Sequence, residues 1–249
     1  MLTLRKGSDR GRTEISWLDS RHSFSFGEYR DPGHMGFRRL RVINEDFIAG
    51  GGGFGTHPHR DMEILTYVVE GGLTHRDSLG NGSTIAPGRL QRMTAGRGIA
   101  HSEFNASKTE RVHLLQIWIE PEQRGLPPGY EEREIELDAA TERPLAIATP
   151  DGRDGSLTVH QDVVVYAGRP KAGGRHGAAI AAGRGVWIQL VRGEATAESG
   201  AALPRRAENA SASAGAMRLQ AGDAVAFEGE SAWSLVAETD AEYLAFDLG

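Results

Sequence analysis

Short runs of β-branched and aromatic residues recur along this chain of 249 residues, and glycine, aspartate or asparagine bounds most of them. Four clear examples are residues 63–70, 111–120, 185–192 and 241–248. Runs of this length and composition are typical of β-strands. No long segment repeats its apolar residues with the period of an amphipathic helix. The sequence therefore predicts an all-β fold, either a sandwich or a barrel.

The two halves of the chain resemble distant copies of each other. Each has a strand that ends in a glycine turn, at Gly71 and at Gly193, and a later glycine turn, at Gly88 and at Gly222, that leads into another strand. Self-similarity of this kind predicts two β-barrels of similar size.

Prolines and an acidic run interrupt the chain between these halves, and they set the predicted boundaries. We expect an N-terminal barrel at 1–130, a connector with a short helical turn at 131–155, and a C-terminal barrel at 156–249. The Ala/Ser-rich stretch 200–215 is predicted to be a surface loop.

Two short motifs carry the chemistry of the chain. The first is His57-Pro58-His59, and the second, about forty residues later, is His101-Ser102-Glu103. A strand has a period of two, so the two outer residues of each motif point the same way. Two such strands facing each other in a small barrel would bring together three imidazoles and one carboxylate. This set predicts a metal site in the N-terminal half.

The donor types limit which metal this site can hold. Neutral imidazole suits Fe(II), Ni, Cu, Zn, Mn and Co, and four protein ligands leave two positions of an octahedral ion open. A structural zinc site would be closed and usually rich in thiolates, but the chain has no cysteine. We therefore expect one catalytic divalent ion, with Fe(II) as the first choice.

Composition excludes several classes of function. The formal net charge is −6, so there is no basic footprint for nucleic acid or an anionic membrane. No apolar run is long enough to span a bilayer, and the N-terminus lacks the apolar region of a secretion signal. Together with the absence of cysteine, these features predict a cytoplasmic monomer that acts on a small molecule.

The metal motifs resemble those of the cupin superfamily, and more narrowly those of the pirin family. The cupin pattern is met by Gly51, His57, His59 and Glu63, followed by Gly98, His101 and Asn105. The pirin resemblance extends over residues 15–120 and is weak after residue 150. It is carried by the stretches Thr56–Ile64, His75–Ser78, Met93–Glu103, Arg21–Gly27 and Leu40–Asp46.

The resemblance implies a bicupin, that is, two stacked antiparallel barrels of the double-stranded β-helix or jelly-roll type. In pirins the metal ligands match His57, His59, His101 and Glu103, whereas the residue that matches Glu63 is not a ligand. After residue 103 there is no His-x-His or His-x-Glu, and the last histidine is His176. We therefore expect no metal in the C-terminal barrel.

Two functions follow from the resemblance. Bacterial pirin-like proteins are often quercetin 2,3-dioxygenases, which implies a flavonol or similar aromatic enol and dioxygen as substrates, with Glu103 as catalytic base. A eukaryotic pirin is an iron-dependent transcriptional co-regulator, which implies a non-enzymatic iron-binding regulatory or protein-interaction module. A deep apolar cavity open to the metal would favour the enzyme, and a shallow or plugged cavity would favour the module. Other histidines rank lower, and His75 and His113 are expected at barrel-wall or surface positions.

Overall fold

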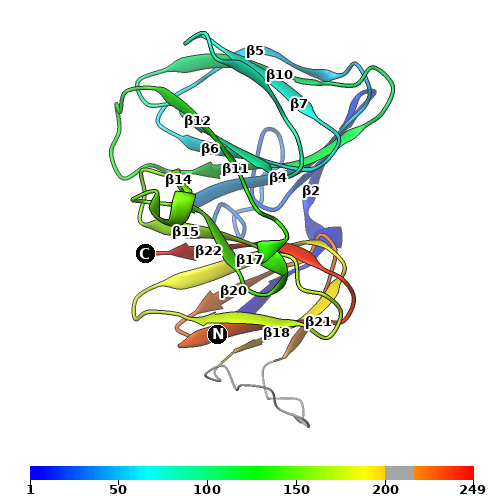
Figure 1. Ribbon diagram of the computed structural model, residues 1–249, viewed down its shortest axis with the longest axis vertical. Helices are drawn as coiled ribbons and strands as arrows, with labels where there is room; N and C mark the ends of the chain where they lie inside the picture. The colour runs from blue at the N-terminus through cyan, green and yellow to red at the C-terminus, as the bar shows by residue number, and fades with distance from the viewer. Residues whose placement is uncertain (200–215) are drawn as a thin grey trace. The chain divides into compact units, whose positions relative to one another are not determined.

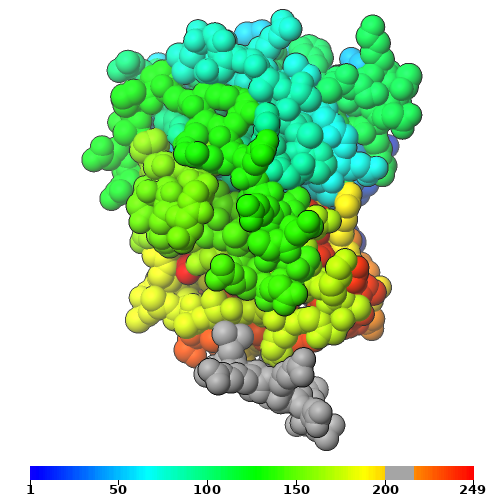
Figure 2. All heavy atoms as spheres, in the orientation of Figure 1, coloured from blue at the N-terminus to red at the C-terminus, as the bar shows by residue number. Residues whose placement is uncertain are grey.

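A computed structural model describes residues 1–199 and 216–249, and the predicted loop at 200–215 lies outside the described residues. The described chain is almost entirely β-structure and forms two compact units. The first comprises residues 10–135 and 149–162, and the second comprises residues 1–9, 136–148 and 163–249. The space-filling view in Figure 2 shows side chains packed closely over the face in view, filling the gaps between the ribbons of Figure 1.

Two antiparallel sheets form the unit of residues 10–135 and 149–162 (Figure 1). The order of the larger sheet is β12 (Gly129–Glu134), β9 (Arg89–Thr94), β6 (Glu63–Glu70), β11 (Val112–Ile119), β4 (Leu40–Ile48), β3 (Leu18–His22) and β2 (Gly11–Ile15). The order of the smaller sheet is β5 (Gly53–His59), β10 (Ile99–Asn105), β7 (Leu73–Asp77) and β8 (Gly82–Ile85).

The apolar faces of these two sheets pack against each other. One core cluster combines Val68 and Val112 of the larger sheet with Leu73 and Ile85 of the smaller sheet, and all four are buried. β6 is buried along almost its whole length, which explains why its sequence reads as a nearly continuous apolar run. The core holds the small sheet, which carries both metal motifs, firmly over the large one.

The second unit repeats this arrangement. Its larger sheet has the order β1 (Leu2–Arg5), β20 (Ala224–Glu228), β17 (Gly185–Arg192), β22 (Glu242–Leu248), β15 (Val163–Gly168) and β13 (Leu145–Thr149). Its smaller sheet has the order β16 (Arg175–Ala179), β21 (Ala232–Ala237), β18 (Glu194–Ser199) and β19 (Met217–Gln220). The order of these six strands matches that of the six from β12 to β3 in the first unit, and the two smaller sheets match in all four strands, which confirms the predicted duplication and the all-β fold.

The remaining elements are short. They are the 3₁₀ helices η1 (Gly7–Asp9), η2 (Ala139–Thr141) and η3 (Arg153–Gly155), and the strand β14 (Leu157–Thr158). η2 is the helical turn expected between the two halves. Among residues 1–199 and 216–249, none of the helices has the length and apolarity needed to cross a bilayer.

The unit boundaries differ from the predicted 1–130, 131–155 and 156–249 in two places. The N-terminal strand β1 pairs with β20, with Leu2 opposite Phe227, so residues 1–9 belong to the second unit. Residues 149–162 return to the first unit, where the backbone N–H of Glu122 donates to the carbonyl of His160. Both exchanges depend on contacts between segments distant in sequence, and proline and glycine punctuation carries no information about such contacts.

Candidate metal centre

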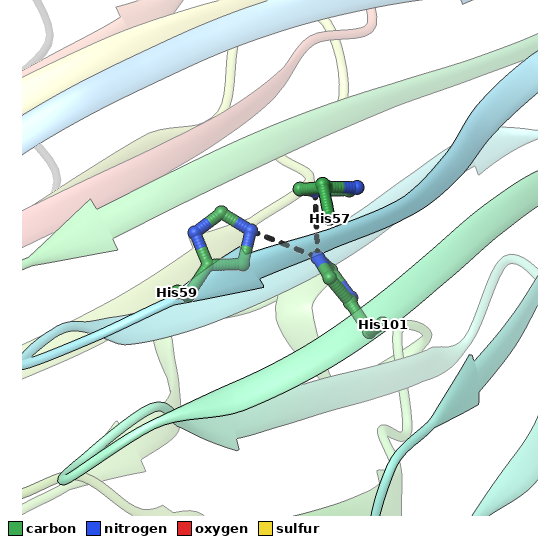
Figure 3. A group of neighbouring side chains, drawn as sticks. All are labelled: His57, His59 and His101. Carbon is green, nitrogen blue, oxygen red and sulfur yellow. Dashed lines mark hydrogen bonds between the residues drawn. The ribbon is translucent and has the colours of Figure 1, made fainter.

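β5 and β10 are neighbouring antiparallel strands, and their pairing determines the relative positions of three histidines. His101 lies directly opposite His57, and the period of two places His59 on the same face as His57. Pro58 lies between them on the edge strand of the small sheet, where a missing backbone donor costs least. Figure 3 shows the three imidazole rings turned toward one another.

The ring nitrogens converge on one point. The Nε2 atom of His101 lies 2.9 Å from Nε2 of His59 and 3.0 Å from Nε2 of His57. The Nδ1 atom of His57 lies 2.8 Å from the carbonyl oxygen of Gly55, so Nδ1 carries the proton and donates it. The lone pair of His57 therefore sits on Nε2 and faces the other two rings.

Burial keeps the rings of His59 and His101 neutral. Loss of solvent, followed by the charge of His57, lowers the pKa of His59 to about 4. Loss of solvent, followed by the charges of His59, His57 and His75, lowers the pKa of His101 to about 2. Three neutral imidazoles with converging nitrogens repel one another unless a proton or a cation lies between them. The donor set therefore fits a divalent transition metal.

Glu103 lies beside this triad, and its side chain is not directed at the same point as the three imidazoles. A carboxylate oxygen of Glu103 and one ring nitrogen each of His75 and His101 all lie within 4.8 Å of one another. The ring nitrogens of His57, His59 and His101 form a second such group, which does not include Glu103. The side-chain amide of Gln116 donates to Glu103 Oε1 at 2.6 Å. A break in the β5–β10 register between His101 and Glu103 accompanies this offset.

The surroundings of Glu103 raise the pKa of its carboxyl. Burial, and to a lesser extent the negative charge of Asp46, raises the pKa of Glu103 to about 7, against the opposing hydrogen bond from Gln116. Gln116 is itself fixed, because its carbonyl oxygen accepts a hydrogen bond from the hydroxyl of Thr66 at 3.1 Å. A buried carboxylate next to three neutral imidazoles can supply the anionic charge that a divalent ion requires.

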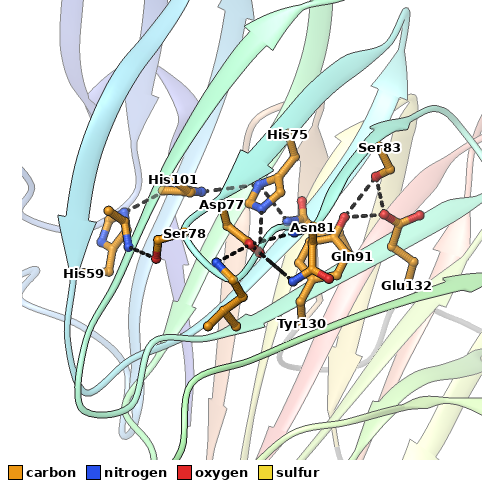
Figure 4. A network of polar contacts seen from close by, with 12 residues as sticks. His59, His75, Asp77, Ser78, Asn81, Ser83, Gln91, His101, Tyr130 and Glu132 are labelled. Atoms are coloured by element: carbon orange, nitrogen blue, oxygen red, sulfur yellow. Dashed lines mark hydrogen bonds and ion pairs between the residues drawn. The ribbon is translucent and has the colours of Figure 1, made fainter.

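A chain of hydrogen bonds lies behind His101, on β7 (Figure 4). Nδ1 of His101 lies 3.3 Å from Nδ1 of His75, and Nε2 of His75 lies 3.5 Å from Oδ2 of Asp77. Gln91 also approaches Nδ1 of His75, at 3.0 Å, and the side-chain amide of Asn81 donates to Asp77. If His75 donates to Asp77, its Nδ1 can accept from His101, which leaves the Nε2 lone pair of His101 facing the triad.

The sequence predicts barrel-wall or surface positions for His75 and His113, and both are buried. His113 Nε2 contacts Glu45 at 2.8 Å, away from the triad. The spacing of His75 and Asp77, two residues apart on one strand face, is the same signal that identifies the ligands and could have drawn attention to this pair. Glu63 lies apart from the triad, contacting Thr94 and His160 at 3.1 Å each.

The triad opens into a cavity of about 780 Å³ within this unit. His57, His59, His101 and Glu103 belong to its lining. The walls are mainly apolar and aromatic, formed by Ile15, Leu18, Phe26, Tyr29, Phe54, Ile64 and Trp118. Ser20, His22, Asn44, Asp46 and Gln116 form a polar strip in the lining, and the remaining lining residues are Arg12, Thr13, Glu14, Gly27 and Glu28. The volume is that of a typical small-molecule site.

Two β-barrels, one of them with a histidine-rich centre, define a bicupin. The sequence profile of the pirin family matches residues 4–119, and that of the quercetinase C-terminal cupin domain matches residues 146–248. The chain is 47% identical over 248 residues to a quercetin 2,3-dioxygenase of Escherichia coli (strain K12), covering 100% of this chain and 99% of the relative. It is 37% identical to a putative quercetin 2,3-dioxygenase of Pasteurella multocida, with both chains fully covered. The chain belongs to the pirin family.

Solved structures agree with this assignment. The crystal structure of YhhW from Escherichia coli matches with a TM-score of 0.89 at 46% identity, covering 100% of this chain and 98% of that one. The structure of the bacterial pirin YhhW in complex with nickel(II) matches with a TM-score of 0.88 at the same identity, covering 100% and 99%. The fold is thus that of a pirin bicupin, and a divalent-metal centre is consistent with both the family and the donor set.

Proposed function

We propose that this protein is a metal-dependent dioxygenase that cleaves flavonols such as quercetin. The observation that carries the proposal is that the imidazole triad lines a largely apolar cavity of about 780 Å³. Planar aromatic substrates favour such walls, since ring stacking and apolar burial both stabilise them. The names of the most similar relatives support the same activity.

In this proposal His57, His59, His101 and Glu103 hold one divalent ion. Fe(II) is our first choice, and Ni, Cu, Zn, Mn and Co are compatible with the same donors. When bound, such an ion would act as a Lewis acid toward an oxyanion of the substrate and would mediate electron transfer between substrate and dioxygen. The three imidazoles would supply its nitrogen ligands, and Glu103, which lies beside them in the cavity lining, would supply the carboxylate.

Glu103 also serves as the base in this proposal. Its carboxylate lies in the cavity lining, where it can accept the proton of the substrate hydroxyl that binds the metal. Gln116 donates a hydrogen bond to Oε1 and so orients the carboxylate. Phe26 and Trp118, whose ring centroids lie 5.4 Å apart, form an apolar wall that keeps water away from the reacting atoms.

An oxygen-uptake assay tests the proposal. Metal-free protein is reconstituted anaerobically with Fe(II), Ni, Cu, Zn, Mn or Co in separate samples, and each sample is mixed with quercetin in air-saturated buffer. At least one metal form should consume oxygen in proportion to the quercetin lost. If no metal form consumed oxygen with any flavonol, the dioxygenase proposal would give way to the non-enzymatic iron-binding module.

The cavity favours the enzyme over that module. A binding module needs only a surface whose contacts change when the metal binds. We expect such a module to have a shallow or plugged cavity. We also propose that the protein works in the cytoplasm, which the absence of cysteine supports, and that it is a monomer. Size-exclusion chromatography with light scattering would test the monomer.

A further inference from the structure

Asp46 is a buried carboxyl that the proposed metal chemistry leaves unused. It lies on β4, opposite Ser20 of β3 and Leu114 of β11. The alternation of the strand directs Asn44 and Asp46 into the cavity, whereas Glu45 points to the other face of the sheet and pairs with Arg10 and His113. Asp46 therefore belongs to the lining of the cavity.

One oxygen of Asp46 has no hydrogen-bond partner. Asp46 is 3% exposed, and Ser20 donates a hydrogen bond to its carboxyl, but Oδ1 is buried and unpaired. Among the buried side-chain atoms in the described chain that lack a partner, Asp46 Oδ1 is the one that belongs to a residue lining this cavity. Buried polar atoms are almost always paired, so the unpaired oxygen indicates a missing donor.

The neighbouring polar groups of the same strip are already satisfied. Nδ1 of His22 contacts Oδ1 of Asn44 at 2.7 Å, and Nε2 of His22 contacts the hydroxyl of Thr13 at 2.8 Å. The His22 ring also packs near those of Phe26 and Tyr29, with centroids 5.3 and 6.4 Å away. A planar ligand in this cavity would thus meet aromatic groups and, among the buried groups of the strip, one carboxyl oxygen without a partner; Arg12, Glu14 and Glu28 also line the cavity.

We propose that Asp46 accepts a hydrogen bond from a hydroxyl group of the bound substrate, distinct from the hydroxyl that reaches the metal. The inference rests on the proposed function and narrows it to aromatic enols that carry at least one further hydroxyl. Asp46 is then a specificity-determining residue, because a substrate without that hydroxyl leaves a buried carboxyl oxygen unpaired.

Burial also raises the pKa of Asp46 to about 7, against the hydrogen bond from Ser20 and together with the charge of Glu45. In either protonation state the carboxyl can pair with a hydroxyl group, as acceptor when ionised and as donor when neutral. The role of Asp46 in binding therefore follows from its position in the cavity and is the same whether the carboxyl is ionised or protonated.

The assignment is tested by measuring how tightly each of several protein variants binds each of several flavonols. Dissociation constants are measured anaerobically, so that no turnover occurs, from quenching of tryptophan fluorescence, since Trp118 lines the cavity. The ligands are quercetin and flavonols that lack the hydroxyl groups of one ring at a time. The variants are Asp46→Asn, which keeps the shape and the contact with Ser20, and Asp46→Ala, which leaves no polar atom. Asp240→Asn, an exposed carboxylate in the second unit, is the control for the change in charge.

The effect of the Asp46 variants on affinity is expected to depend on one hydroxyl group of the ligand. Asp46→Ala should weaken quercetin binding about 10- to 100-fold, the range of a hydrogen bond to a charged group, and Asp46→Asn somewhat less. For the ligand that lacks the partner hydroxyl, both variants should bind within about twofold of the parent protein. Asp240→Asn should not change the binding of any ligand, and the metal content of all variants should be equal.

The outcomes separate this inference from the proposed function. If both Asp46 variants weakened every ligand to the same extent, Oδ1 would be paired with water or would have only a structural role, and the assignment would be overturned. If quercetin bound with the expected hydroxyl dependence but no oxygen were consumed, the dioxygenase proposal alone would fail. If none of the flavonols bound, both would be overturned.

Discussion

Removing the metal should make the fold sensitive to acid, because His101 is held neutral by burial. In the folded protein the pKa of His101 is lowered from 6.5 to about 2, chiefly by loss of solvent and then by its imidazole neighbours. The unfolded chain therefore binds one more proton than the folded chain below pH 6.5, and stability falls as the pH falls. Each pH unit below 6.5 costs about 1.4 kcal/mol, so His101 alone should remove about 2 kcal/mol by pH 5. His59, with its pKa lowered to about 4, adds to the loss over part of the same range.

The assay compares wild-type protein with His101→Gln, both kept metal-free by a chelator, between pH 8 and pH 5. Hydrogen exchange of peptides from β6 and β11, read by mass spectrometry, reports the opening free energy of the unit that holds the site. The wild-type value should fall by about 2 kcal/mol more than that of His101→Gln over this range. Above pH 7.5 the two curves should run parallel, which serves as the internal control. Parallel curves down to pH 5 would refute the idea that burial keeps this imidazole neutral.

Three further outcomes are expected. Elemental analysis should find close to one divalent ion per chain, and a second ion bound within residues 150–249 would contradict a single site. His57→Ala or His101→Ala should abolish tight metal binding, measured by competition with a chromophoric chelator, while circular dichroism stays native; unfolding upon chelation would instead make the metal structural. Glu103→Gln, compared at matched metal occupancy, should lower the rate of quercetin turnover by about 10²–10⁴-fold with little change in affinity, and a parental rate would remove Glu103 from the role of base.

The strand period predicts which residues of each motif share a face, but the sequence predicts two motif strands that face each other, whereas the structure pairs them as neighbours in one sheet. Alternation along β5 places His57 and His59 on one face, and antiparallel pairing sets His101 opposite His57. The edge position of β5 also follows from sequence, since Pro58 cannot donate to a second neighbour. The shared face of His57 and His59 and the edge position of Pro58 are local features, whereas the pairing of His101 with His57 joins strands distant in sequence.

The features that the sequence does not predict depend on contacts across the sheets. The offset of Glu103 arises from a register break and from Gln116 on β11, which no pattern near residue 103 contains. Likewise, the burial of His75 depends on its position opposite Glu103 in the β7–β10 pair. Asp46 contributes to the pirin resemblance of its strand, but its unpaired oxygen becomes visible only when the cavity is formed.

The duplicated strand order shows why chemistry is expected in one unit and not in the other. β16 and β21 occupy the places that β5 and β10 hold in the first unit, but they pair Ala178 with Trp233 and His176 with Leu235. Trp233 and Leu235 are buried in one apolar cluster with Phe227 and Tyr243. His176 is already satisfied, since its ring nitrogens contact the hydroxyl of Tyr243 at 2.9 Å and the carbonyl of Thr141 at 3.1 Å. Large apolar side chains thus fill the interior at the position where the first unit keeps an open cavity, and a packed interior offers neither a donor set nor space for a substrate. Restoring histidines to β16 and β21 would therefore not be enough to create a second centre, because the aromatic core would also have to be opened.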